Sequence, residues 1–269
     1  MENQNVNENV NVNEIKTSEN NQPVINENVN VIQQQPTAII EIEGKEIINL
    51  IKKATIDKRG EIGFYLKSDG LTIKQLHGTG VSLVIVKAKN LLNYKVNSEK
   101  VIGFDASNLL TFSKIFKRNE IYYIEFYENE IIVKSNYLKA KLKTIELGSS
   151  NIIDKEPTYG DTSIFVIEKS QLKPVLDNSK EFNEITLKVE NNELITQLKS
   201  EINELTFNLN AINKNLKEND KVNLNLSYLK DFLKNIDNRE IIKINFSTDM
   251  PIKVETADAI FYLAPVIHE

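Results

Sequence analysis

The sequence predicts an α+β protein of two similar domains, each made of two β-α-β-β-β units with helices on one face of antiparallel sheets. Short runs rich in Ile, Val, Tyr and Phe alternate with four amphipathic stretches from Thr37 onward, as expected for strands and surface helices. The order of these elements occurs twice along the chain, which indicates a duplicated domain.

The chain divides into four predicted segments. Residues 1–36 are rich in Asn and Gln and repeat the motif NENVNV, so we expect a disordered tail that contributes little to a core. Residues 37–147 form the first predicted domain and 162–269 the second. Between them, 148–161 contain Gly, Ser, Asn and Pro without a clear period, which is typical of a connecting loop.

Eight strands are predicted from β-branched and aromatic runs. They cover 62–66, 81–87, 121–127, 131–134, 185–189, 205–209, 241–246 and 260–263. Four helices are predicted near 45–54, 107–118, 170–178 and 227–237. Ser107, Ser170 and Ser227 stand where an N-cap side chain would accept a free backbone N–H.

An internal repeat relates the two domains. A shift of 120 residues aligns 107–126 with 227–246, and a shift of 125 aligns 39–51 with 164–176. Apolar and charged positions coincide in both alignments, and the elements follow in the same order. Two domains of one fold explain this pattern better than chance matches between Ile- and Lys-rich segments.

Composition excludes several classes of site. The chain has no cysteine and two histidines, which excludes a disulfide framework and a thiolate zinc site and argues against a histidine metal cluster. The sequence contains no phosphate-binding glycine loop and no nucleophile–His arrangement. We therefore expect a protein that is not an enzyme and uses no cofactor. The alternative that stays open is catalysis by a pair of carboxylates.

Membrane and export signals are also missing from the sequence. No run approaches the roughly 18 apolar residues of a membrane span. The polar, acidic N-terminus resembles neither a signal peptide nor a transit peptide. We expect an intracellular protein with no membrane partner.

Charge is distributed unevenly along the chain. The net charge is -5, and residues 1–36 contribute -4 of it through five acids and one base. The rest is therefore close to neutral, with an excess of bases on the predicted helices and an acidic remainder. Such a protein can bind nucleic acid when its bases share one face.

The helical bases are the candidate DNA-binding residues. On a helical wheel of about 100° per residue, they lie to one side of the apolar arc, at related positions in the repeat. They are Lys52, Lys53, Lys114, Lys117, Arg118, Lys173, Lys230 and Lys234. No aromatic or amide side chains interleave them, so we expect sequence-independent, salt-sensitive contact with duplex DNA. The alternative is that they are ordinary solvated lysines.

Three motifs resemble those of a known family. The run DMPIKVETADAIFYLAPVI, 249–267, is similar to a final hairpin with a Leu-Ala-Pro ending. The run DGLTIKQLHGTGVSLV, 69–84, is similar to a strand, central loop and following strand, and FDASNLLTFSKIFKR, 104–118, to a second helix. Over roughly 38–268, the sequence resembles the proliferating cell nuclear antigen type of sliding clamp of archaea, eukaryotes and some of their viruses.

The resemblance implies the DNA clamp fold and a ring, usually of three two-domain subunits, whose helices line a hole threaded by duplex DNA. It implies three kinds of partner: DNA polymerase, other proteins with clamp-binding peptide motifs, and an ATP-driven clamp loader. It also implies a homotrimer, located in the cytoplasm or nucleoid of an archaeon, or in the nucleus or viral replication site of a eukaryotic or viral protein. Two alternatives remain: a same-fold polymerase accessory factor acting as a monomer or dimer, and one subunit of a heterotrimer.

An apolar pocket for partner peptides, beneath the connecting loop, is a further implication of the resemblance. Its residues would be Leu76, Val81, Leu83, Ile152, Ile153, Pro157, Pro251, Tyr262, Leu263, Ala264 and Pro265. An alternative assigns Leu83, Leu263 and Ala264 to the core. His77 and Gly80 depart from the family pattern, which usually has an acidic and a polar or basic residue there, so we expect the edge of the pocket to differ.

Overall fold

The structure is a computed structural model, and it describes residues 35–78, 81–153 and 155–267. The tail predicted over 1–36 falls outside these residues except at Gln35 and Pro36, as does the expectation for Gly80. No helix of the described residues is long and apolar enough to cross a membrane.

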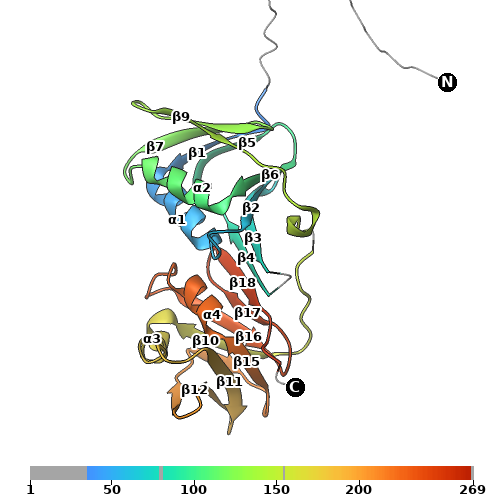
Figure 1. The fold of residues 1–269 in the computed structure, drawn as a ribbon, viewed down its shortest axis with the longest axis vertical. Helices are drawn as coiled ribbons and strands as arrows, with labels where there is room; N and C mark the ends of the chain where they lie inside the picture. Colours follow the sequence, from blue (N-terminus) through green and yellow to red (C-terminus); the bar gives the residue numbers. More distant parts are fainter. Residues whose placement is uncertain (1–34, 79–80, 154, 268–269) are drawn as a thin grey trace, which may run out of the picture. The chain divides into compact units, whose positions relative to one another are not determined.

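The elements occur in two copies of the same order, which we call the N-terminal half (37–147) and the C-terminal half (162–267) (Figure 1). The N-terminal half contains β1 (Ala38–Glu43), α1 (Gly44–Ala54), β2 (Glu61–Lys67), β3 (Gly70–His77), β4 (Ser82–Lys87), β5 (Leu91–Val96), β6 (Lys100–Asp105), α2 (Ala106–Phe112), the 3-10 turn η1 (Ser113–Ile115), β7 (Ile121–Phe126), β8 (Glu130–Lys134) and β9 (Lys139–Lys143). The linker holds a 3-10 turn, η2 (Ser149–Asn151).

The C-terminal half repeats this order. It contains β10 (Ser163–Glu168), the 3-10 turn η3 (Lys169–Leu172), α3 (Lys173–Asp177), β11 (Glu184–Glu190), β12 (Glu193–Lys199), β13 (Glu204–Leu209), β14 (Asn213–Asn215), β15 (Lys221–Asn225), α4 (Leu226–Leu233), β16 (Ile241–Phe246), β17 (Ile252–Glu255) and β18 (Ala259–Leu263). Each half thus has the two predicted β-α-β-β-β units, with one more strand, β5 or β14, between them.

Three antiparallel sheets hold these strands. The first has the order β5-β1-β7-β8-β9, the second β14-β10-β16-β17-β18-β4-β3-β2-β6, and the third β13-β12-β11-β15. In the second sheet β18 pairs with β4, from Ala259 opposite Val86 to Leu263 opposite Ser82. The two halves therefore share one sheet within a single compact unit, and the domain boundaries at 147 and 162 remain an interpretation of the repeat.

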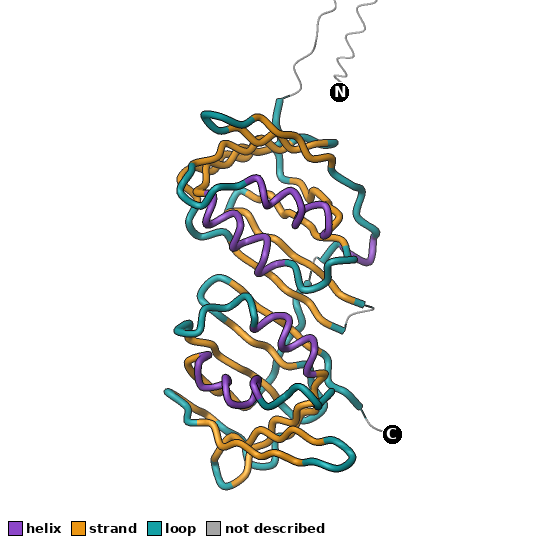
Figure 2. The backbone as a smooth tube through the Cα atoms, turned by 60° about the vertical axis from the view of Figure 1, so that its left-hand side comes forward, coloured by secondary structure: helices purple, strands orange, loops and turns teal. Residues whose placement is uncertain are grey.

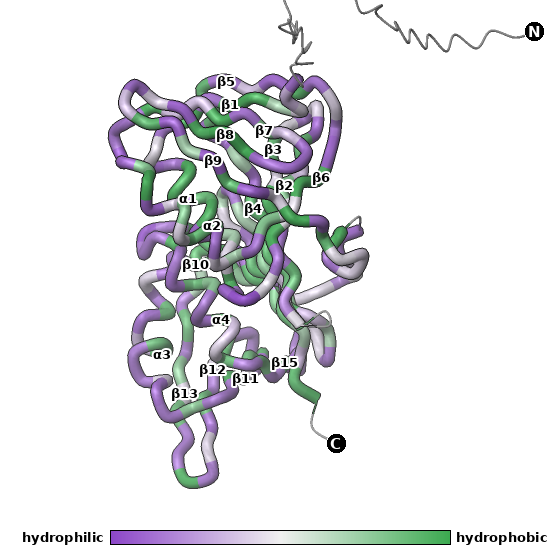
Figure 3. The backbone as a smooth tube through the Cα atoms, turned by 45° about the horizontal axis from the view of Figure 1, so that its top comes forward, coloured by the Kyte–Doolittle hydropathy of each residue, from purple (hydrophilic) through white to green (hydrophobic). Residues whose placement is uncertain are grey.

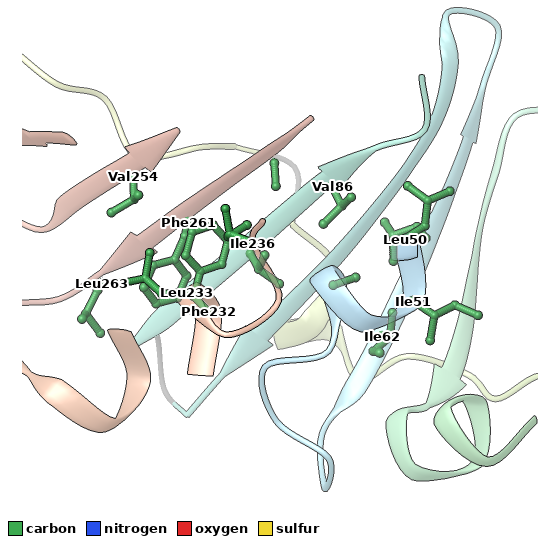
Figure 4. Packing of buried hydrophobic residues seen from close by; sticks show 14 of the residues in the cluster. Leu50, Ile51, Ile62, Val86, Phe232, Leu233, Ile236, Val254, Phe261 and Leu263 are labelled. Atoms are coloured by element: carbon green, nitrogen blue, oxygen red, sulfur yellow. The ribbon is translucent and has the colours of Figure 1, made fainter. Parts of the chain in front are cut away.

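The helices pack on one face of this shared sheet, as predicted. Side chains alternate across a strand, so Val86 of β4 and Phe261 of β18 point into the core that receives α1 and α4 (Figure 4). The rings of Phe232 and Phe261 stack at 4.6 Å. Figure 2 shows the helices as two pairs, one pair in each half, and Figure 3 shows hydrophobic residues concentrated along the central strands and hydrophilic ones in the turns.

The helix starts differ from the prediction. The side chain of Asp105 accepts the N–H of Asn108 at 2.7 Å, and that of Asn225 accepts the N–H of Ser227 at 3.0 Å. Asp105 and Asn225 are therefore the N-caps, and the assignment to Ser107 and Ser227 was wrong. The reason is that both helices follow directly from a strand, so the last strand residue already has the extended backbone that a cap requires.

The second and third predicted helices are also less regular than expected. The segment 107–118 contains α2 followed by the 3-10 turn η1, and 170–178 begins with the 3-10 turn η3. Ser170 lies inside η3 and donates its hydroxyl to Glu168 at 2.6 Å, so it does not cap a helix. Pro174 stands at the start of α3, where its missing N–H costs least.

Candidate functional site

The predicted DNA-binding bases divide into free and engaged side chains. In α1, Ile47, Leu50 and Ile51 are buried, which turns Lys52 to the exposed side of the helix. Lys114, in η1, is exposed in the same way. Neither side chain has a hydrogen bond or ion pair with another residue of the described ranges.

Lys117 and Arg118 extend this exposed group beyond η1. Arg118 is exposed and has no side-chain partner among residues 35–78, 81–153 and 155–267. The ammonium group of Lys117 lies 3.8 Å from the centre of the Tyr137 ring and 3.7 Å from a carboxylate oxygen of Glu120. A cation–π contact of this kind keeps the charge and fixes its position.

The bases of the C-terminal half are more often neutralised. Lys173 pairs with Asp177 one turn along α3, and Lys234 lies 2.5 Å from Asp231. These exposed pairs are weak, but each acid cancels the charge beside it.

Lys53 and Lys230 are engaged inside the chain. Lys53 lies 2.8 Å from Asp258 and 3.5 Å from Glu240, with 14% of its side chain exposed. Lys230 donates to the carbonyl of Ser179 at 2.8 Å, and burial lowers its pKa. The two side chains hold parts of the chain together, in contrast to the free ammonium groups of Lys52 and Lys114.

A hollow of about 660 Å³ lies under the linker, on the face of the shared sheet opposite the helices. Leu76, Val81, Leu83, Ile152, Ile153, Pro157, Pro251, Tyr262 and Ala264, all predicted pocket residues, line it together with Ser150, Lys155 and Glu156. The structure therefore brings together residues from β3, β4, the linker, the turn before β17 and the end of β18.

Two predicted pocket residues, Leu263 and Pro265, do not line this hollow. Leu263 is fully buried in the core on the helix side, because it neighbours Tyr262 in β18 and must face the other way. Pro265 forms an isolated bridge with Leu224. Leu83, in contrast, belongs to the small buried cluster on the hollow side with Tyr262 and Ile153.

The linker is held to the sheet by polar contacts around Ile153. The Ile153 N–H donates to the Tyr65 hydroxyl at 2.6 Å, and its carbonyl accepts from Lys74 at 3.0 Å. The Glu61 carboxylate accepts from the N–H of Gly148 at 3.0 Å and from the amide of Asn151 at 2.7 Å. One wall of the hollow is therefore anchored rather than loose.

Two tyrosines fix the far end of the linker. The rings of Tyr159 and Tyr262 stack at 5.9 Å, and the Tyr262 hydroxyl donates to Glu156 at 2.9 Å. Burial raises the pKa of Tyr159 to about 12. Burial, followed by the bond to Glu156, also raises the pKa of Tyr262. Both hydroxyls are therefore protonated at neutral pH, as the donation to Glu156 requires.

His77 lies between the two halves, outside the lining of the hollow. Its Nδ1 is 2.8 Å from an Asp57 oxygen, which is close enough for an ion pair, but the two atoms are not aligned for a hydrogen bond. Its Nε2 is 3.1 Å from the Tyr228 hydroxyl. The imidazole thus connects the loop after α1 to α4. In the described part of the chain, no group of three or more His, Asp or Glu side chains is placed to hold a metal ion.

Comparison with known proteins identifies the fold. No family model matches the chain. A DNA polymerase sliding clamp of Methanococcus maripaludis is 27% identical over 247 residues, covering 83% of this chain and 95% of the relative. A structure of the C-terminal region of FEN-1 bound to A. fulgidus PCNA matches with a TM-score of 0.73 at 18% identity, over 86% of this chain and 99% of that one. A PCNA2–PCNA3 complex from Sulfolobus tokodaii matches with a TM-score of 0.70 at 18% identity, over 84% and 98%. The chain is therefore similar in sequence to DNA polymerase sliding clamps and shares its fold with PCNA structures.

Some residues of the candidate site carry no signal in the sequence. Lys155 and Glu156 line the hollow, but a charged pair in an irregular loop carries no periodic signal. The anchors Glu61, Tyr65 and Lys74 lie about 80 to 90 positions from their linker partners, so no local pattern could have found them.

Proposed function

We propose that the protein is a DNA sliding clamp, a processivity factor that encircles duplex DNA as a ring and tethers DNA polymerase and other replication or repair proteins to it. The duplicated fold carries this proposal: two copies join edge to edge in one sheet, with helices on one face. The relatives named DNA polymerase sliding clamp support it. The clamp acts by binding and needs no catalytic site of its own.

Ring formation follows from the repeat. The join between the halves is the β18–β4 pair, and the counterparts of these strands in the other copy are β9 and β13. Both are edge strands, β9 of the first sheet and β13 of the third, so each presents unpaired backbone groups to a further strand. Pairing β9 of one subunit with β13 of the next repeats the internal join, and such head-to-tail contacts close into a ring if the rotation permits. We propose three subunits, following the family.

DNA contact is assigned to the helix side of the ring. Lys52, Lys114 and Arg118 offer free positive charge there, and Lys117, Lys173 and Lys234 offer charge that neighbouring acids reduce. Contact through screened charges with phosphates is weak and independent of sequence. Weak contact suits a protein that stays on DNA by enclosing it and moves along it.

Partner proteins are assigned to the hollow under the linker. Its wall is apolar at Val81, Leu83 and Pro251 and charged at Lys155 and Glu156, a combination that fits a short peptide with apolar anchors and a polar flank. The structure of the C-terminal region of FEN-1 bound to A. fulgidus PCNA supports a terminal protein segment as the kind of partner. We propose that DNA polymerase binds here, and that a separate ATP-driven loader opens the ring.

Primer extension with the replicative polymerase of the same organism tests the function. Wild-type protein should lengthen the products made in a single binding event. The triple variant Lys52→Glu, Lys114→Glu and Lys234→Glu should not produce this increase in product length. A control variant with the same change in charge at exposed strand positions should still produce it: Lys67→Glu, Lys95→Glu and Lys221→Glu. Equal product lengths for both variants would contradict the assigned DNA surface, and no stimulation by wild type would contradict the clamp function.

A further inference from the structure

A second hollow, of about 510 Å³, lies beside the one assigned to partner proteins. Its wall combines β6, the turn between β7 and β8, and residues 144–147, which lead into the linker. Ile152 lines both hollows. Two apolar side chains of the second hollow face solvent, since Ile145 is 37% exposed and Ile152 42%. A hollow of this size with exposed apolar side chains is suited to a bound segment of protein.

The backbone of β6 is also open to a partner. β6 is the last strand of the second sheet, so one of its edges is free. A bridge covers that edge at one point, where the Ile145 N–H donates to the Gly103 carbonyl at 2.9 Å. Alternate residues of a strand direct their backbone groups to the same side, so the N–H and C=O of Val101 point to this edge too. No strand of the described residues pairs with Val101 there, and such an edge can accept an added strand.

The described chain begins next to this hollow. The Pro36 carbonyl accepts from the Asn97 side chain at 2.8 Å, and the Thr37 N–H donates to the Phe126 carbonyl at 2.7 Å. Asn97 lies in the turn that leads into β6. Phe126 ends β7, directly before the turn that lines the hollow. The 34 residues that precede Gln35 are therefore attached beside the hollow.

The pairing of β1 with β5 gives the direction in which these residues approach. Ala38 lies opposite Val96, so the residues before Ala38 run antiparallel to the chain that continues from Val96 into β6. Six residues back from Ala38 is Ile32, and six residues on from Val96 is Ile102, which lines the hollow. An extended chain advances about 3.3 Å per residue, so Ile32 is within about 10 Å of Gln35 along the chain.

The sequence before Gln35 suits this place. Residues 28–31, NVNV, alternate polar and apolar side chains and are followed by Ile32, a pattern typical of a strand with one apolar face. Residues 28–36 carry no charge, and the lysine of the hollow, Lys100, is already paired with Glu128. An uncharged segment can therefore bind without leaving a charge unpaired. The motif NENVNV at 26–31 also occurs at 7–12, much further from Gln35.

We propose that residues 29–32 of the chain occupy the second hollow of their own subunit, as a strand beside β6. Docking covers Ile145 and Ile152 and places the segment next to the hollow assigned to partner proteins. It also holds the preceding residues, which carry five acids and one base, on the linker side of the subunit. A net charge of -4 close to Lys52 and Lys114 would compete with DNA phosphates for these bases. Docking keeps the acidic segment away from the DNA surface.

Pairs of introduced cysteines test the proposal in the full-length protein, because the natural chain contains no cysteine. Val31→Cys is combined with Glu146→Cys, at an exposed position of the hollow. The dilute protein is oxidised with glutathione disulfide, and mass spectrometry of its tryptic peptides measures the disulfide between positions 31 and 146. A disulfide requires Cα atoms about 4.4–6.8 Å apart, so its yield reports how often the two positions meet.

Two control pairs each share one cysteine with the test pair. Val31→Cys with Lys95→Cys places the second thiol on the free edge of β5, close to Pro36 but outside the hollow. Val12→Cys with Glu146→Cys uses the distant copy of the NENVNV motif. The test pair should form about tenfold more disulfide than either control, a ratio that partial burial of one apolar side chain can sustain.

Three outcomes would overturn the proposal. Equal yields at positions 95 and 146 would show that the segment has no preferred place, and equal yields from positions 12 and 31 would contradict the assignment to residues 29–32. A disulfide that joins two chains on a non-reducing gel would contradict docking within one subunit. Asn129→Cys, also in the hollow, replaces Glu146→Cys if that variant does not fold. Primer extension is a separate measurement, so failed docking leaves the proposed clamp function untouched.

A change in the tail itself gives an independent check. Val29→Asn with Ile32→Asn, added to the test pair, removes two apolar side chains of the docked segment and should lower the disulfide yield to that of the controls. Val10→Asn with Val12→Asn changes the distant motif in the same way and should leave the yield as it is. An unchanged yield in the first variant would overturn the proposal.

Discussion

Truncation of Ile153 to alanine should release the linker without unfolding the protein. Ile153 is 8% exposed and packs against Leu83, Ile85 and Tyr262. Removing a buried Ile side chain to Ala costs about 2 to 5 kcal/mol in protein cores. Because this cluster is small and lies at the surface, we expect the lower end, about 2 kcal/mol. The loss falls on the local opening of the linker, since the main core does not include Ile153.

Hydrogen exchange measures that opening directly. A loss of about 2 kcal/mol increases the population of the open linker roughly thirtyfold, and protected linker amides should exchange faster by that factor. The N–H of Ile153 itself is a suitable probe, because it is bonded to Tyr65. Ile152→Ala is the control, since Ile152 is 42% exposed and should have little effect. Equal exchange in wild type and Ile153→Ala would refute the anchoring role of this side chain.

Three further changes test the energetics of the fold. Lys53→Met leaves two carboxylates without their cation and should lower the free energy of unfolding by about 1–2 kcal/mol. The neighbouring Lys52→Met should change that free energy by less than about 0.5 kcal/mol. Equal free energies of unfolding for the two variants in denaturant titrations would contradict this. A Cβ at Gly44 would lie 2.0 Å from a backbone oxygen, so Gly44→Ala should cost on the order of 3 kcal/mol, while Gly160→Ala, with nothing within 4 Å, should be nearly neutral. Burial raises the pKa of Tyr159 from 10.0 to about 12, so the stability that its protonated hydroxyl contributes is complete below pH 10 and is lost as the pH rises through about 12. Tyr159→Phe should therefore flatten the fall in the free energy of unfolding between pH 10 and 12. The same pH profile in the variant and in wild type would argue against this role of Tyr159.

The sequence reveals those parts of the fold that have local signals. The apolar spacing of α1 gives its buried face and the exposure of Lys52, and apolar runs give strands such as β16. The strands that escaped prediction, among them β9 (KAKLK) and β14 (NKN), are polar. They exist because a neighbouring strand pairs with them, and composition alone does not report that neighbour.

The candidate site shows the same limit. Lys53 looks like Lys52 in the sequence, but its partner Asp258 is 205 residues away, and only the folded chain shows the ion pair. The pairing of Lys173 with Asp177 could have been expected from the one-turn spacing. The placement of Leu263 could also have been expected, because a strand residue next to Tyr262 must face the opposite side.

The topological claim is the centre of this account, and retention on circular DNA tests it most directly. Protein loaded onto nicked circular DNA should stay bound at high salt and leave when a restriction enzyme makes the DNA linear, because enclosure does not depend on screened charges. The same protein mixed with linear DNA should not be retained. Loss from circular and linear DNA at the same rate would contradict a closed ring around the duplex.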